Sequence, residues 1–160
     1  MPWIVPMLSA DVWKGKPGKW FTWGEMTSTS QKLPNVPDTT ERINLRMLCY
    51  ALLDPLREHL RRPVRVTSGF RSDAVNEAVG GSKSSAHRHG LAADIKVKGL
   101  DAHALMQAAI EADLDFDQAI AYHPSRGGHM HLGLATGRQR RQKLWARKSG
   151  GYEPYDNTQA

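Results

Sequence analysis

Histidine side chains cluster in one stretch of the chain: six of the seven lie between residues 87 and 131. His87 and Asp94 stand seven positions apart in the first group, and His129 and His131 form the second. If the second group lies in a strand, its two histidines project from the same face, because side chains alternate along a strand. Two imidazoles and one carboxylate, with a fourth position left open, suit a catalytic zinc ion. The pattern therefore predicts that the two groups contribute ligands to one zinc site.

The single cysteine, Cys49, excludes an internal disulfide and a Cys-based zinc finger. Structural zinc sites are usually closed by four protein ligands, most often including thiolates. A lone histidine is more often a surface or hydrogen-bonded residue than a ligand, and His-x-His pairs also occur by chance. The two groups together, rather than either one alone, favour a metal site with a catalytic role.

Local signals predict the elements that must position these residues. Apolar residues recur at helical spacing after Asp38, and Pro55 is expected to kink or end that helix. Ser72 and Asp101 are expected to cap two further helices, the second of which runs to Asp113. Short strands are expected at residues 64–67, 92–97, 117–122 and 129–134. Helices and strands mix without strict alternation, which predicts one α+β domain with a small antiparallel or mixed sheet flanked by helices.

The length and composition are those of one globular domain: 160 residues, 40% hydrophobic and 24% charged. No run approaches the roughly 18 apolar residues that a membrane span needs. The first residues lack the basic and apolar regions of a secretory signal, so no signal peptide is expected. Residues 1–37 predict irregular structure that packs through its aromatic side chains, which are Trp3, Trp13, Trp20, Phe21 and Trp23.

Positive charge is concentrated near the C-terminus. The chain has 22 Lys and Arg against 16 Asp and Glu, and without one acid-free stretch the two kinds balance at 16 each. The six cations of that stretch are Arg138, Arg140, Arg141, Lys143, Arg147 and Lys148. Such a patch favours a polyanionic partner, such as nucleic acid, an acidic wall polymer or lipid head groups. It fits a solvated helix end equally well.

Further motifs stand in order along the chain. The main blocks are residues 67–72 (TSGFRS), Asn76, 79–81 (VGG), 85–94 (SAHRHGLAAD) and 129–131 (HMH). Three more blocks are residues 21–26 (FTWGEM), 53–57 (LDPLR) and 116–120 (FDQAI). Together they resemble the zinc D-Ala-D-Ala carboxypeptidase family of metallopeptidases, over roughly residues 20–135, and their order and spacing make the resemblance specific.

The resemblance implies a Hedgehog/DD-peptidase fold and a role for each matching residue. His87, Asp94 and His131 match the zinc ligands of the family. Arg71 matches the arginine that faces the scissile carbonyl or a substrate carboxylate, and Ser85 matches a residue that lines the substrate pocket. The implied domain spans residues 1–137, with a motif core at about 64–134, and residues 138–160 form a basic tail that is not a separate domain.

His129 matches a histidine that one branch of the family has two places before its last ligand. Other branches use a nearby glutamate as general base, and this chain has Ala121-Tyr122-His123 where some wall-lytic relatives have an acid. An imidazole with a pKa near the working pH can accept a proton from water and return it to the leaving amine. We therefore take His129 and Arg71 as the candidate catalytic residues, with the identity of the base left open. Asp117 is expected to orient a zinc ligand through the second nitrogen of its ring.

The activity that the resemblance implies is zinc-dependent cleavage of peptidoglycan stem or cross-bridge peptides, by a murein endopeptidase or a D,D- or L,D-carboxypeptidase. A compact catalytic domain without a visible signal peptide resembles a phage endolysin, which is made in the host bacterial cytoplasm and acts on the cell wall or in the periplasm. The implied cofactor is Zn²⁺ and the implied partner is bacterial peptidoglycan. The basic tail would contact the anionic envelope surface, and we expect a monomer with no dedicated nucleic-acid partner.

Two other functions remain open on the sequence. The same fold could keep its zinc without catalysis and serve as a cell-wall-binding module, since the glutamate of other branches is missing. The basic tail taken alone would also suit a nucleic-acid-binding protein, whose affinity would fall steeply with salt and survive loss of zinc.

Overall fold

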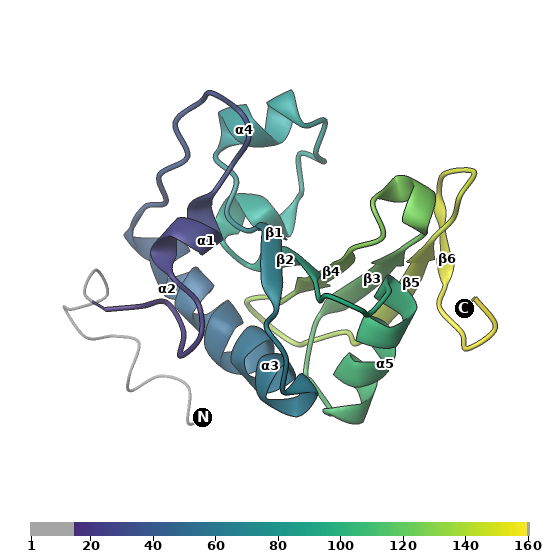
Figure 1. The fold of residues 1–160 in the computed structure, drawn as a ribbon. Coiled ribbons are helices and arrows are strands. Elements are labelled where there is room, and N and C mark those ends of the chain that lie inside the picture. The colour runs from purple at the N-terminus through teal and green to yellow at the C-terminus, as the bar shows by residue number, and fades with distance from the viewer. Residues whose placement is uncertain (1–14, 160) are drawn as a thin grey trace.

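Six strands form one mixed sheet in the order β1-β2-β4-β3-β5-β6 (Figure 1). The computed structural model describes residues 15–159. Within them the strands are β1 (Arg65–Ser68), β2 (Ala92–Lys96), β3 (Gln118–Tyr122), β4 (Met130–Gly133), β5 (Gln142–Ala146) and β6 (Tyr152–Pro154). Neighbouring strands are antiparallel except β3 and β5, which run parallel. The sheet and the helices around it confirm the expected α+β class.

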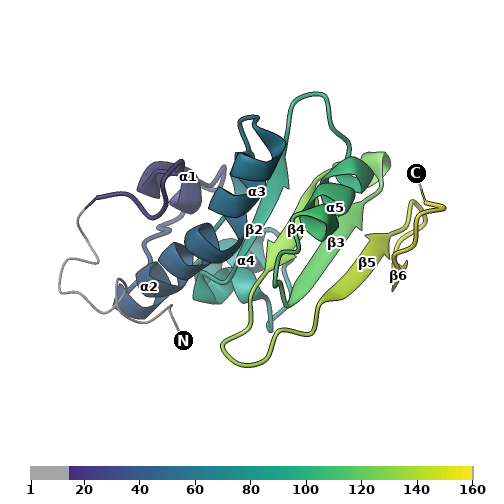
Figure 2. The same cartoon turned by 90° about the horizontal axis from the view of Figure 1, so that it is seen from below.

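The longer helices cover one face of the sheet, as Figure 2 shows. The chain passes from α2 (Thr39–Leu48) through a π-helical turn η1 (Cys49–Leu53) into α3 (Asp54–Leu60), and α5 (Ala102–Glu111) follows β2. Two short helices, α1 (Trp23–Thr27) and α4 (Asp73–Ala78), lie at the β1 side of the molecule (Figure 1). No helix in this part of the chain is long and apolar enough to cross a membrane.

Alternation along the central strands separates the core from the opposite face. Ala93 and Ile95 of β2 and Met130 and Leu132 of β4 are buried in one hydrophobic cluster. The helices contribute to that cluster Leu45, Leu48, Leu52, Leu105 and Met106. Because successive side chains of a strand point to opposite faces, the residues between these apolar ones face away from the helices. The second face of the sheet is therefore left for polar side chains.

The predicted helix starts at Ser72 and Asp101 are confirmed, because the Ser72 hydroxyl accepts a hydrogen bond from the amide of Val75 and the Asp101 carboxylate accepts one from Ala104. Pro55 does not end the helical path, which continues past it into α3, so the expected helix end at this residue is wrong. Pro55 lies in the first turn of α3, directly after the π-helical turn. Just before Pro55 the regular α-helical hydrogen bonds give way to a π-helical turn, in which the amide of Asp54 bonds to the carbonyl of Cys49, and this change of pattern accommodates a residue without an amide.

The C-terminal region contributes two strands to the sheet, so a helix end in the basic stretch is excluded. Some of its cations are paired: Arg141 forms ion pairs with Asp113 and Asp115, at 3.0 Å each. Among the N-terminal aromatic residues, Phe21 is buried, Trp23 packs partly buried against the core and Trp20 is exposed. Trp3 and Trp13 lie outside the described residues.

Candidate metal centre

Asp94 and His131 face each other across two neighbouring strands. They are register partners on β2 and β4, and both lie on the sheet face that points away from the helices. The third residue, His87, comes from a 3-10 helix, η2 (Ala86–His89), which ends at Gly90 in the left-handed conformation and leads into β2. A Cβ atom at Gly90 would lie 2.5 Å from the carbonyl oxygen of Glu41, so this turn requires glycine.

The ligand atoms of these three residues converge on one point. Nε2 of His87 lies 3.2 Å from Oδ1 of Asp94 and 3.2 Å from Nδ1 of His131, and the last two atoms are 3.1 Å apart. Tetrahedral zinc with bonds of about 2.0–2.1 Å would hold its ligand atoms about 3.3 Å apart. The spacing of the three atoms therefore fits a zinc ion, and the three residues form a group that could hold a metal.

The protonation of His87 also fits a metal ligand. Its Nδ1 lies 2.7 Å from the carbonyl oxygen of Gly69, which can only accept a hydrogen bond, so Nδ1 carries the proton. In the neutral ring Nε2 then presents a lone pair to the carboxylate of Asp94 and to His131. Such a convergence of electron pairs is favourable only with a proton or a cation between them. Burial lowers the pKa of His131, which favours the neutral imidazole that metal binding needs.

Asp94 is the centre of the electrostatic network. Burial by itself raises the pKa of its carboxyl group, but the interactions with the rings of His131 and His87 outweigh this effect and hold the pKa well below its usual range. The second oxygen of Asp94 accepts a hydrogen bond of 2.8 Å from Nη2 of Arg71, whose Nε donates to Oγ of Ser68. Arg71 thus places a guanidinium group directly beside the three converging residues.

His129 lies at the edge of the same cluster. Its Nε2 is 3.9 Å from Oδ2 of Asp94, and its ring stacks on the ring of Tyr122 with centroids 4.2 Å apart. Burial lowers the pKa of His129, so its ring is predominantly neutral at neutral pH and can accept a proton. The structure therefore brings together His87, Asp94, His131, Arg71 and His129, all five of which the sequence predicted as site residues.

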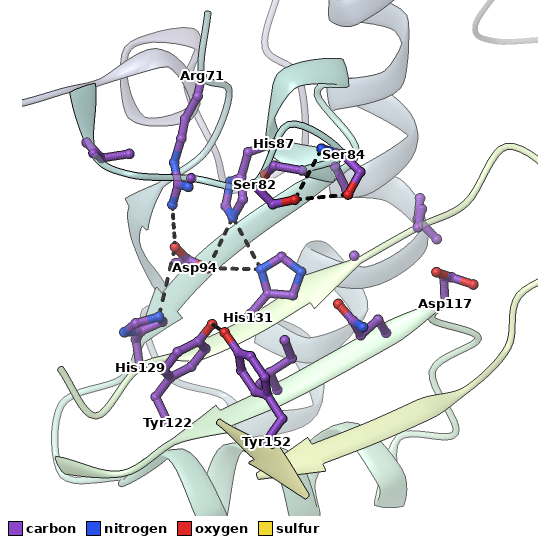
Figure 3. A pocket seen from close by; sticks show the side chains of 18 of the residues that line it. Arg71, Ser82, Ser84, His87, Asp94, Asp117, Tyr122, His129, His131 and Tyr152 are labelled. Atoms are coloured by element: carbon purple, nitrogen blue, oxygen red, sulfur yellow. Dashed lines mark hydrogen bonds and ion pairs between the residues drawn. The ribbon is translucent and has the colours of Figure 1, made fainter. Parts of the chain in front are cut away.

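The cluster opens into a cleft of 730 Å³ with two different walls, seen in Figure 3. Ser82 and Ser84, from the segment between α4 and η2, lie along one side, and Ser85 of the same segment also lines the cleft. Tyr122 and Tyr152 lie on the other side, and their hydroxyl groups are 3.3 Å apart. Ser85 therefore lines the cleft, as the sequence predicted. The cleft is open and lined with hydrogen-bonding groups, which suits an extended polar chain.

The expected role of Asp117 is not what the structure shows. Its carboxylate forms a bidentate ion pair with Arg140, at 2.6 and 2.9 Å, and also accepts a hydrogen bond from the amide of Arg140. The partner that fixes the ring of His87 is the Gly69 carbonyl instead. A backbone carbonyl serves this purpose as well as a carboxylate does, which is why the site needs no second acid.

Sequence reasoning missed several residues of the cleft, among them Tyr122, Arg126, Arg140 and Tyr152. The signal for Tyr122 was present, because it alternates with Gln118 and Ile120 on β3, and all three line the cleft. Tyr152 belongs to a strand that the local pattern did not reveal. Arg126 lies in the loop between β3 and β4, where no periodicity applies.

Comparisons with known proteins identify the family of this chain. No curated protein matches the chain. The family described as Peptidase M15 matches residues 19–132, a segment that contains His87, Asp94, His129 and His131 and ends before β5. Since the match covers well over half of the chain, this protein belongs to the Peptidase M15 family of metallopeptidases.

Proposed function

We propose that this protein is a zinc-dependent peptidase that cleaves the stem or cross-bridge peptides of bacterial peptidoglycan. The observation that carries the proposal is the convergence of His87, Asp94 and His131 within hydrogen-bonding distance of one another at the floor of an open cleft. Three protein ligands leave one position for water or substrate, as in catalytic zinc sites. Membership of a family of zinc peptidases supports the same reaction class.

His87, Asp94 and His131 would hold the metal. When bound, zinc would supply Lewis acidity. It would also lower the pKa of a water molecule, so that this water loses a proton and acts as a nucleophile near neutral pH. His129 is neutral and faces the same carboxylate, so its Nε2 can accept the proton of the attacking water and deliver it to the leaving amine. Arg71 directs a guanidinium towards the site, where it can stabilise negative charge that develops on the carbonyl oxygen.

The finer part of the proposal concerns the biological role. We place the enzyme as a phage endolysin, made in the host cytoplasm and acting on the wall at lysis. Arg138, Lys143 and Lys148 support contact with the anionic envelope, because none of them has a carboxylate partner within residues 15–159. A cationic surface of this kind attracts a polyanionic polymer through long-range electrostatics.

Product analysis tests the reaction. Purified peptidoglycan is incubated with the zinc-loaded protein and, in parallel, with its His131→Ala variant, and the products are identified by mass spectrometry. New amino termini would identify an endopeptidase, and released D-alanine would identify a carboxypeptidase, in both cases only with the unmodified protein. Intact peptidoglycan together with stoichiometric bound zinc would reject the hydrolase and favour the binding module of the same fold.

A further inference from the structure

The hairpin of β5 and β6 forms part of the cleft, in a row of residues that crosses three strands and ends beside a fourth. Tyr152 on β6 pairs with Ala146 on β5, Ala146 pairs with Tyr122 on β3, and the amide of Tyr122 donates a hydrogen bond to the carbonyl of His129 beside β4. Because Ala146 has only a methyl group, the two tyrosine side chains meet above it, with hydroxyl groups 3.3 Å apart. The candidate base is thus connected, through Tyr122, to the hairpin.

Arg126 occupies the space beside this tyrosine pair. Its guanidinium carbon lies 5.3 Å from the ring centre of Tyr122 and 5.4 Å from that of Tyr152. Nη1 of Arg126 donates to the carbonyl oxygens of Arg147 and Gly151, in the turn between β5 and β6. The turn therefore holds the guanidinium at the cleft through one nitrogen, Nη1. The other N–H groups of the guanidinium are available to a ligand.

The charge of Arg126 is not neutralised by the described chain. Of the arginines that line the cleft, Arg71 is paired with Asp94, and Arg140 is paired with Asp117. Within residues 15–159 Arg126 has no carboxylate within ion-pair distance, although its side chain is partly buried. A partly buried guanidinium that lies beside two aromatic rings is well suited to receive a carboxylate, because its planar N–H groups match the two oxygens.

We propose that Arg126 is a specificity-determining residue that binds a free internal carboxylate of the substrate peptide, with the hydroxyl groups of Tyr122 and Tyr152 as additional donors. The inference rests on the proposed peptidase function and names the chemistry of its substrate: an acidic peptide with a carboxylate besides the terminal one. The two hydroxyl groups share one hydrogen bond, so one O–H remains to donate to the same carboxylate. The two carbonyl groups that hold Arg126, and Tyr152, belong to residues 142–154, beyond the segment that matches the family.

Matched peptides test the inference. Synthetic stem peptides are prepared in pairs that differ in one internal group, either the carboxylate or the corresponding carboxamide, with the terminal carboxylate unchanged. One pair varies the D-glutamyl α-carboxyl group and the other varies the free carboxyl group of the diamino acid. The ratio of kcat/KM within each pair is measured for the zinc-loaded protein, and the affinity for each peptide is measured by fluorescence titration.

We expect the unmodified protein to prefer the carboxylate form of at least one pair by about tenfold to hundredfold, as for a hydrogen bond to a charged group. Arg126→Gln should bring that ratio close to one, whereas Arg126→Lys should keep part of it through its charge. Lys98→Gln changes the net charge equally at an exposed position outside the cleft and should leave the ratio unchanged. Thermal unfolding of each variant shows whether the loop between β3 and β4, which carries Arg126, still contributes the same stability.

The outcomes separate this inference from the proposed function. If both forms are cleaved equally, or if Arg126→Gln slows both by the same factor, Arg126 only holds the loop and the inference is wrong while the peptidase function stands. If no peptide is cleaved but the carboxylate form binds more tightly in an Arg126-dependent way, the inference stands and the hydrolase function fails. Absence of both cleavage and binding overturns the two together.

Discussion

The carbonyl oxygen of Gly69 lies 2.7 Å from Nδ1 of His87, so a backbone group determines which nitrogen of this histidine is free to bind a metal. Gly69 itself is tightly enclosed, because a Cβ atom added there would lie 2.3 Å from the carbonyl oxygen of Met26. The same Met26 carbonyl accepts a hydrogen bond of 2.8 Å from the amide of Phe70. The loop after β1 is thus fixed against α1, and it fixes His87 in turn.

This geometry predicts the effect of Gly69→Ala. The methyl group would push the loop away from Met26, which should cost about 1–3 kcal/mol of unfolding free energy and weaken zinc binding through His87. Gly137→Ala is the matched control, since a Cβ atom added at that position would have nothing within 4 Å of it. Urea denaturation and a chelator competition check both effects, and a Gly69→Ala protein that unfolds and binds zinc like Gly137→Ala would contradict the prediction.

Removing one metal ligand should abolish most of the stabilisation that zinc gives to the folded protein. Zinc at about 1,000 times its dissociation constant stabilises a folded protein by about 4 kcal/mol, so the zinc-loaded protein should melt well above the same protein in EDTA. Asp94→Asn should abolish most of this difference, because it removes the only carboxylate among the three ligands and leaves Arg71 without its partner. Thermal scans with and without EDTA measure the zinc-dependent difference in melting temperature, and metal analysis measures the bound zinc. An unchanged zinc-dependent shift would show that Asp94 is not a ligand.

His129→Ala should separate catalysis from metal binding. His129 is outside the group of three converging ligand atoms, so the variant should retain stoichiometric zinc. Loss of a general acid or base typically lowers the rate about 10²–10⁴-fold, and we expect a fall in kcat of that size on peptidoglycan fragments. Product release followed by mass spectrometry gives kcat, and metal analysis gives the zinc content. Full turnover by the variant would assign the proton transfer to another group.

The Asp117–Arg140 pair should make stability depend on pH in acid. Hydrogen bonds from Arg140 hold the pKa of Asp117 below its ordinary value of 3.8. A carboxyl group whose pKa is lower in the folded state adds stability above its unfolded pKa, and this contribution is lost as the pH falls through the folded value. The unmodified protein should therefore be more stable than Asp117→Asn at pH 7, and the difference should shrink at a pH below the ordinary carboxyl pKa of 3.8. Urea denaturation at both pH values tests this, and an equal difference at both would contradict it.

Local signals in the sequence were sufficient for much of the fold, and the resemblance to a known family supplied the candidate ligand set. Caps such as Asp101 act within one helical turn, and alternation along β2 and β4 places Asp94 and His131 on one face without any knowledge of distant contacts. The π-helical turn before Pro55 has no local sequence signal, so the continuing helix could not be predicted.

Long-range pairing accounts for the parts that were missed. Strand β5 lacks a regular alternation of apolar residues, and its parallel pairing with β3 depends on residues more than 20 positions away. The Asp117–Arg140 pair, the Tyr122–Tyr152 contact and the position of Arg126 all follow from that pairing. None of these contacts can be predicted from the sequence until the pairing of the hairpin with β3 is known.

The metal ligands and the far wall of the cleft come from different parts of the fold. Every residue that converges on the metal position belongs to η2, β2 or β4, whereas Tyr152 and the turn that holds Arg126 come from a hairpin at the outer edge of the sheet. Mutations, insertions or exchanges within the hairpin can alter the far wall of the cleft without moving a ligand. Divergence in this segment would therefore change the cleft wall that contacts a peptide. The metal ligands, and with them the chemistry, would stay the same.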